Sequence, residues 1–131
     1  MSEGARWIEQ ARRDLDDAAL LAEHGRHATA CFLAQQAAGK ALKGVLYAAG
    51  ADVVLGHSVR TLCGEVTLLD PQVQPRCPDW GALDQFYIPT RYPDALPGGI
   101  PAEAYTASQS AGALATAREV LAFADGRAST E

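Results

Sequence analysis

An uninterrupted apolar repeat constrains the fold of this chain more than any other feature. From about residue 28 to residue 49, apolar side chains recur every three or four positions over about five helical turns. That spacing is the period of one face of an α-helix. The repeat consists of Ala30, Leu33, Ala34, Ala37, Ala38, Ala41, Leu42, Val45 and Leu46. Because alanines dominate its middle, another helix can approach closely and lie nearly antiparallel, and we predict a helical bundle.

A second amphipathic pattern precedes this helix, over residues 4–24. Its apolar stripe consists of Trp7, Ala11, Leu15, Ala18 and Ala22. Asp14 follows Trp7 by seven positions and so points almost the same way, which places its carboxylate at the border of the stripe. Gly25 lies just beyond this pattern, where a glycine commonly ends a helix. We therefore expect the first two helices to form a hairpin.

Weaker patterns complete the prediction of an all-α, up-and-down bundle of four long helices plus one short helix. A third helix is expected to begin near His57, with His57 or Ser58 as its N-cap. Three prolines within residues 70–79 predict a loop. A short helix of about ten residues should end before Pro89, and the last helix should cover residues 102–124.

Composition limits the possible domain organisation and ligands. A chain of 131 residues suits one compact domain, residues 1–131, and we expect a frayed tail at residues 126–131. Hydrophobic residues make up 48% of the chain and aromatic residues 7%, a mixture that favours packed helices over a β-sandwich. The net charge of -5 argues against a general nucleic-acid coat, because neutralising many phosphates needs clustered Lys and Arg. A local basic site remains open.

The sequence also predicts where the protein resides. It has no run of 18 apolar residues, and Glu3, Arg6 and Glu9 interrupt any signal-peptide pattern. We therefore expect a cytoplasmic protein with no membrane association. Its three cysteines are odd in number and lack a CxxC spacing, which suits free thiols in a reducing compartment. Cys31 and Cys63 are expected in the core.

A row of polar side chains runs beside the apolar stripe of the second helix. Gln36, Lys40 and Lys43 follow one another at spacings of four and three residues. Lysines can supply point charges to an anionic ligand, and a glutamine can hydrogen-bond a base or ribose. In the alternative reading, Lys40 pairs with Asp14 across the first two helices while Lys43 projects into water. Pairing and ligand binding would then compete for Lys40.

Two further segments offer functional groups. His57 can act as an acid or base near neutral pH, or serve only as a helix cap. Arg91 and Tyr92 can bind an anionic ligand, or form a latch in which Arg91 satisfies helix-end carbonyls and Tyr92 packs over the bundle. The predicted ligand-binding residues are Asp14, Gln36, Lys40, Lys43, His57, Arg91 and Tyr92. His24 and His27 lack a third nearby ligand, so we expect no metal and no cofactor.

These segments together resemble the HEPN domain family. The resemblance covers nearly the whole chain and rests on Trp7 with Asp14 and Leu15, residues 34–43, His57 with Leu62, and residues 91–94. It implies a small helical bundle that forms a homodimer and pairs with a minimal nucleotidyltransferase in a toxin–antitoxin system. The family name suggests nucleotide binding. In one departure, this chain has Gly39 where the family commonly has an acidic residue.

Many members of the family are ribonucleases whose motif is an Arg followed, after four to six residues, by a His. None of the histidines here has that spacing, and all three precede Arg91. The resemblance therefore favours a binding module without catalytic residues over an enzyme. The alternative is an RNA-cleaving toxin in which His57 and Arg91 meet in space and supply a general base and a cationic stabiliser.

Overall fold

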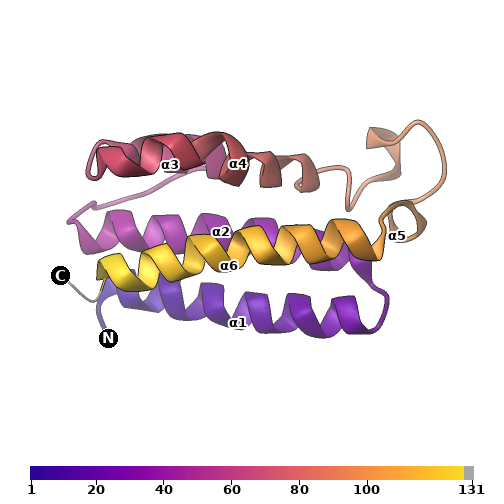
Figure 1. Ribbon diagram of the computed structural model, residues 1–131, viewed down its shortest axis with the longest axis horizontal. Helices are drawn as coiled ribbons and strands as arrows, with labels where there is room; N and C mark the ends of the chain where they lie inside the picture. Colours follow the sequence, from indigo (N-terminus) through magenta and orange to yellow (C-terminus); the bar gives the residue numbers. More distant parts are fainter. Residues whose placement is uncertain (129–131) are drawn as a thin grey trace.

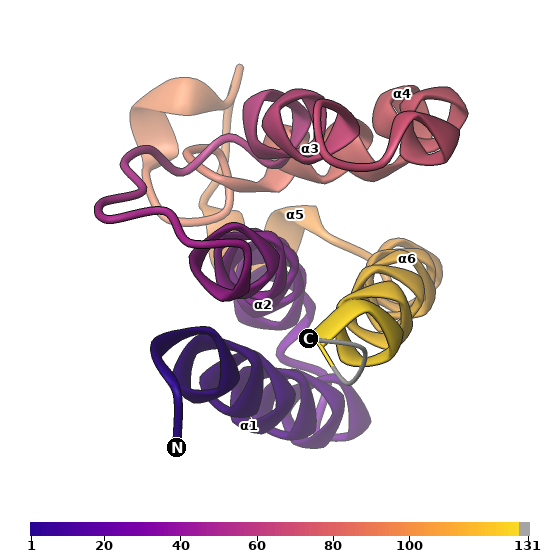
Figure 2. The ribbon, with the colours of Figure 1, turned by 90° about the vertical axis from the view of Figure 1, so that its left-hand side faces the viewer.

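Every regular element that the computed structural model describes, in residues 1–128, is helical (Figure 1). The elements are α1 (Glu3–Glu23), α2 (His27–Ala48), α3 (Val59–Thr67), the 3-10 helix η1 (Pro71–Arg76), α4 (Cys77–Gly81), the 3-10 helices η2 (Ala82–Phe86) and η3 (Pro93–Ala95), α5 (Pro101–Ala104) and α6 (Ala107–Ala128). The long helices α1, α2 and α6 lie side by side, and α3 and α4 form a second layer above them (Figure 2). The predicted all-α bundle is confirmed, with α2 at its centre.

The hairpin of α1 and α2 begins and ends within one residue of its prediction. Gly25 joins the helices with a φ of 76°, a left-handed conformation that glycine adopts readily. At the far end of the hairpin, Gly4 of α1 faces Gly44 of α2. A Cβ atom added to Gly4 would lie 2.6 Å from the Gly44 carbonyl oxygen, closer than real Cβ atoms come. The two backbones are therefore in direct contact there.

The buried face of α1 differs from its prediction. Its buried residues are Gly4, Ile8, Ala11, Asp14, Leu15 and Ala18. Trp7, predicted to belong to this stripe, is only half-buried and stacks on Tyr47, with 5.6 Å between the ring centroids. The backbone contact at Gly4 leaves no space between α1 and α2 for an indole. Ile8, one residue along, takes the place in the core.

The segment predicted as a proline-rich loop is instead helical. Residues 70–79 include η1 and the start of α4. Pro71 is the first residue of η1, and Pro78 is the second residue of α4. A proline is tolerated in the first turn of a helix, where its missing N–H group would have no intrahelical partner. Repeated short helices therefore accommodate prolines that one long helix would exclude.

A disulfide bond joins Cys63 of α3 to Cys77 of α4, across a Cα–Cα distance of 5.6 Å. The expectation that all three cysteines are free thiols was wrong, because the fold packs these two helices against each other. Cys31 is free and buried, and burial raises the pKa of its thiol to about 11. Cys31 and Cys63 both belong to the hydrophobic core, as predicted.

The last predicted helix is divided in two. Tyr105, after α5, has an extended backbone. Thr106 and Gln109 then form reciprocal caps: the Gln109 N–H donates to Thr106 Oγ1 at 3.2 Å, and the Thr106 N–H donates to Gln109 Oε1 at 2.9 Å. This is a capping box, which begins a new helix. The helix α6 continues to Ala128, past the start of the predicted frayed tail, and residues 129–131 lie outside the described part. No helix among the described residues has the length and apolar character needed to cross a membrane.

Candidate functional site

A cavity of about 170 Å³ lies beside α2 and contains four of the seven predicted ligand-binding residues. We call it the lysine cavity. Its walls are Trp7 from α1, residues of α2, and the loop before α3; the lining residues are Trp7, Gln35, Gln36, Gly39, Lys40, Lys43, Gly56 and His57. The chain has only two lysines, and both line this cavity.

Lys40 pairs with the buried carboxylate of Asp14. Its Nζ lies 2.7 Å from Asp14 Oδ2, and the Asp14 side chain is 9% exposed. Asp14 Oδ1 accepts a second hydrogen bond, at 2.9 Å, from Gln10 Nε2. The predicted pairing across the first two helices is therefore present. A buried carboxylate without a partner would cost several kcal/mol of stability. Asp14 therefore keeps the Lys40 ammonium group in place beside the cavity.

Lys43 lies against an aromatic ring instead of projecting into water. Its Nζ is 5.3 Å from the centre of the Trp7 ring, a cation–π contact. Burial, and then the positive charge of Lys40, lower the pKa of Lys43. Trp7 is itself held by Tyr47 and by Glu3, whose Oε1 accepts from the indole Nε1 at 3.0 Å. The cavity therefore combines a cation with a fixed aromatic surface.

Asp84 does not line the cavity but binds residues of its wall, a role that no feature of the sequence predicted. Its carboxylate accepts hydrogen bonds from Gln35 Nε2, Ser58 Oγ and the backbone N–H groups of Val59 and Arg60, at 2.8–3.1 Å. Gln35 is 1% exposed and bridges Asp84 to the carbonyl oxygen of His57. Asp84 thus connects η2, the N-terminus of α3 and the central helix.

His57 is exposed and does not cap α3. The N-cap is Ser58, whose Oγ accepts from the Thr61 N–H at 3.1 Å. The imidazole of His57 stacks on Tyr87, with centroids 5.4 Å apart. Of the two residues predicted as possible N-caps, Ser58 is therefore the N-cap of α3. His57 instead lines the lysine cavity.

Arg91 and Tyr92 do not line the lysine cavity. Arg91 Nε donates to the Tyr87 carbonyl oxygen at 2.9 Å, and its guanidinium carbon lies 4.4 Å from the centre of Phe32 and 4.7 Å from that of Tyr87. The bond to the Tyr87 carbonyl oxygen, just after η2, is the contact predicted for Arg91 in a latch, whereas the contacts with the rings of Phe32 and Tyr87 were not predicted. Tyr92 is 49% exposed and contacts the same guanidinium. Because His57 and Arg91 both contact the ring of Tyr87, that ring connects the latch to the cavity.

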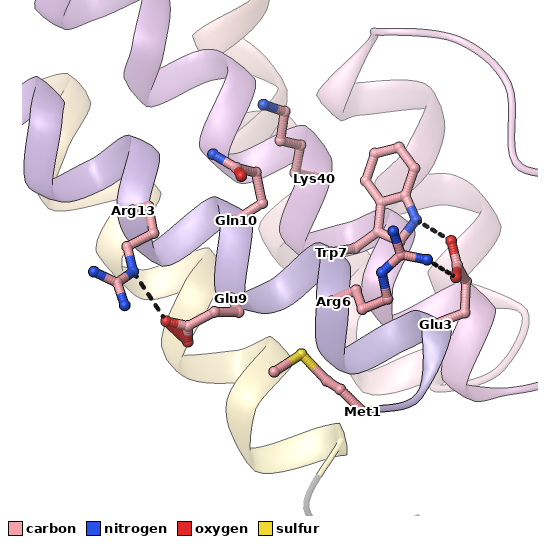
Figure 3. Close-up of a pocket in the computed structure, with 8 residues that line it drawn as sticks. All are labelled: Met1, Glu3, Arg6, Trp7, Glu9, Gln10, Arg13 and Lys40. Carbon is pink, nitrogen blue, oxygen red and sulfur yellow. Dashed lines mark hydrogen bonds and ion pairs between the residues drawn. The ribbon is translucent and has the colours of Figure 1, made fainter.

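A larger hollow of about 720 Å³ adjoins the lysine cavity and shares Trp7 and Lys40 with it. Figure 3 shows its lining residues: Met1, Glu3, Arg6, Trp7, Glu9, Gln10, Arg13 and Lys40. Glu3 pairs with Arg6 at 3.0 Å, and Glu9 pairs with Arg13 at 3.3 Å. Among the lysines and arginines that line the two hollows within residues 1–128, Lys43 is the one that has no carboxylate partner.

No group of three or more His, Cys, Asp or Glu side chains within the described residues is placed to hold a metal ion. His27 Nδ1 lies 2.9 Å from Ser110 Oγ, a contact between α2 and α6. This histidine therefore has a role in packing.

Comparisons with known proteins found one family model and solved structures that are similar to the chain. The HEPN domain model matches residues 5–127. The crystal structure of TT1696 from Thermus thermophilus superposes with a TM-score of 0.82 at 39% identity, covering 97% of this chain and 99% of that one. The structure of ST0689, an archaeal HEPN homologue, superposes with a TM-score of 0.72 at 32% identity, covering 98% and 99%. A search of curated proteins gave no match.

Proposed function

This chain belongs to the HEPN domain family, and we propose that it is a homodimeric binding module that holds a nucleotide in the lysine cavity. Its proposed protein partner is a minimal nucleotidyltransferase in a toxin–antitoxin type system. The observation that carries the nucleotide part is the position of the two lysines, both of which line one cavity together with Gln36 and His57. The cytoplasmic location expected from the sequence stays a prediction.

The chemistry of the lysine cavity supports an anionic, partly aromatic ligand. Lys43 has no carboxylate partner within residues 1–128, so its charge is available to a phosphate. The indole of Trp7 forms an apolar wall of the cavity beside Lys43. At about 170 Å³ the cavity is smaller than ordinary ligand pockets of roughly 300–1,000 Å³, so it would enclose one part of a nucleotide while the rest extends outward.

Gly39 supports the same reading. It lines the lysine cavity, and a Cβ atom added there would lie 3.8 Å from Leu62 Cδ1, an ordinary contact. A longer side chain at this position would meet Leu62 and the His57 carbonyl oxygen, beside the wall of the cavity. The acidic residue common at this place in the family would add a negative charge beside both lysines. Its replacement by glycine favours binding of an anion.

The dimer and the protein partner rest on the family resemblance and on exposed apolar side chains. Val53 and Leu55, between α2 and α3, are 70% and 81% exposed, and Leu20 of α1 is 55% exposed. Phe32 and Tyr105 are partly buried against neighbouring residues and add little to such a surface. Exposed apolar groups of this kind are often covered in a complex. Light scattering that finds only monomer at micromolar concentration would count against the dimer.

Titration calorimetry with ATP, GTP and a short RNA tests the nucleotide site. We expect one of these ligands to bind, and Lys43→Ala to weaken it about 10- to 100-fold, the loss of one charge-assisted contact. Arg118→Ala, an exposed change on α6, should leave binding unchanged. Lys40 is best tested as Lys40→Ala with Asp14→Asn, because the single change would leave the buried Asp14 carboxylate without its cationic partner. No heat from any ligand would reject the site.

The second candidate is the RNA-cleaving toxin. It is favoured by the contact of both His57 and Arg91 with the ring of Tyr87, which brings the two residues into one cluster. Cleavage of RNA by the purified protein, lost in His57→Ala and Arg91→Ala, would support this candidate. Equal toxicity of the wild type and both variants would eliminate it.

A further inference from the structure

The amide groups of Gln35 and Gln36 are held in one orientation. A carboxylate can only accept hydrogen bonds, so Asp84 Oδ1 fixes the neighbouring group of Gln35 as its Nε2, at 3.0 Å. The same Nε2 donates to the His57 carbonyl oxygen at 2.8 Å, a second group that only accepts. Gln35 must therefore turn its Oε1 toward Gln36.

The orientation of the Gln35 amide in turn fixes the orientation of the Gln36 amide, which lines the cavity. Gln36 donates from its Nε2 to Gln35 Oε1 at 2.8 Å. Rotating the Gln36 amide by half a turn would bring two carbonyl oxygens together, so the chain of bonds from Asp84 also fixes this second amide. Gln36 lines the lysine cavity, and no donor within residues 1–128 reaches its Oε1. Gln36 Nε2 keeps a second N–H group, and the free Oε1 is the acceptor that Gln36 can offer a ligand.

We propose that Gln36 selects ligands that bring an N–H donor into the lysine cavity, and that a nucleotide with an amino group on its base binds in preference to the same nucleotide without it. This inference rests on the proposed nucleotide site. Lys40 and Lys43 lie one and two turns beyond Gln36 on α2, about 6 and 10 Å along the helix axis. A nucleoside monophosphate carries its base amine and its phosphate at opposite ends, which suits an acceptor and two cations arranged in a row.

A matched pair of nucleotides tests the preference directly. Adenosine 5′-monophosphate and purine riboside 5′-monophosphate have the same charge and ring system and differ only in the 6-amino group. By calorimetry, we expect the wild-type protein to bind the amino nucleotide about tenfold more tightly, the contribution of one hydrogen bond. Gln36→Leu, which keeps similar volume but removes the acceptor, should bind the two nucleotides equally. Gln85→Leu, an exposed change on η2, should keep the preference.

The outcomes separate this inference from the function on which it rests. If the wild-type protein binds both nucleotides with the same affinity, the nucleotide site stands and the role of Gln36 is overturned. The role is also overturned if Gln36→Leu keeps the tenfold preference. If neither nucleotide binds, the proposed nucleotide site and the inference that rests on it are both overturned. If Gln36→Leu does not fold, Gln36→Met replaces it, because methionine also removes the amide oxygen and keeps the length of the side chain. Equal affinity in the wild-type protein overturns the role of Gln36 without any variant.

Discussion

Replacing Gly44 with leucine should destabilise the protein by about 3 kcal/mol or more, the upper part of the range for overpacked cores. The physical reason is the backbone contact between α1 and α2. A Cβ atom on Gly44 would lie 2.5 Å from Cγ1 of Ile8 and 2.9 Å from the carbonyl oxygen of Gly4. The oxygen belongs to the backbone and cannot rotate away, so a larger side chain must push the two helices apart. Urea unfolding followed by circular dichroism measures the loss.

Gly112 provides the matched control. It lies in α6, and a Cβ atom added there would meet no heavy atom within 4 Å. Gly112→Ala should therefore stabilise the protein by roughly 0.5–1 kcal/mol, because alanine restricts the unfolded chain more than glycine does. If Gly44→Leu unfolds at the same urea concentration as the wild type, the backbones of α1 and α2 are not in contact at this point.

Local signals explain why the hairpin could be predicted from the sequence. The period of the apolar residues and the glycine at position 25 are properties of the segment itself, and they placed both helices to within one residue. The error at Trp7 arose from the same reasoning. Trp7 and Ile8 are neighbours on α1, and the choice between them depends on how closely Gly44 of the other helix approaches.

Other features depended on signals that were missed or on contacts distant in sequence. The start of α6 was encoded locally, because Thr106 and Gln109 have the spacing of a capping box. By contrast, Cys63 and Cys77 are 14 residues apart and meet only because α3 and α4 pack together. A spacing of that kind indicates no pairing by itself.

In the candidate site, too, the local pattern could be predicted from the sequence, and the contacts between distant residues could not. Gln36, Lys40 and Lys43 were brought together correctly because one helix carries all three at spacings of four and three. Arg91 follows a turn, and its Nε bonds to the carbonyl oxygen of Tyr87, four residues earlier, which holds it outside the cavity. Asp84 could not be predicted, since its partners come from α2 and from the start of α3. A carboxylate in a short helix gives no sign of what it will cap.

The importance of Asp84 leads to the second large effect: Asp84→Ala should cost roughly 3–5 kcal/mol of stability. The substitution removes the acceptor for two backbone N–H groups at the start of α3, for Ser58 Oγ and for one hydrogen bond of Gln35. Each buried donor left without a partner costs about 1–3 kcal/mol. Val59 and Arg60 are the first two residues of α3, and losing a side-chain acceptor at a helix N-terminus costs about 1 kcal/mol.

The effect should be localised as well as large. In Asp84→Ala, amide hydrogen exchange should accelerate first at Val59 and Arg60, whose N–H groups lose their acceptor. Asp79→Ala is the control, because Asp79 is exposed on α4 and its loss should change stability by less than about 0.5 kcal/mol. If Asp84→Ala matches this control in urea unfolding, its four hydrogen bonds do not hold α3 against α2. Because Gln35 and the His57 carbonyl share this network, a genuine loss would loosen the wall of the lysine cavity together with the fold.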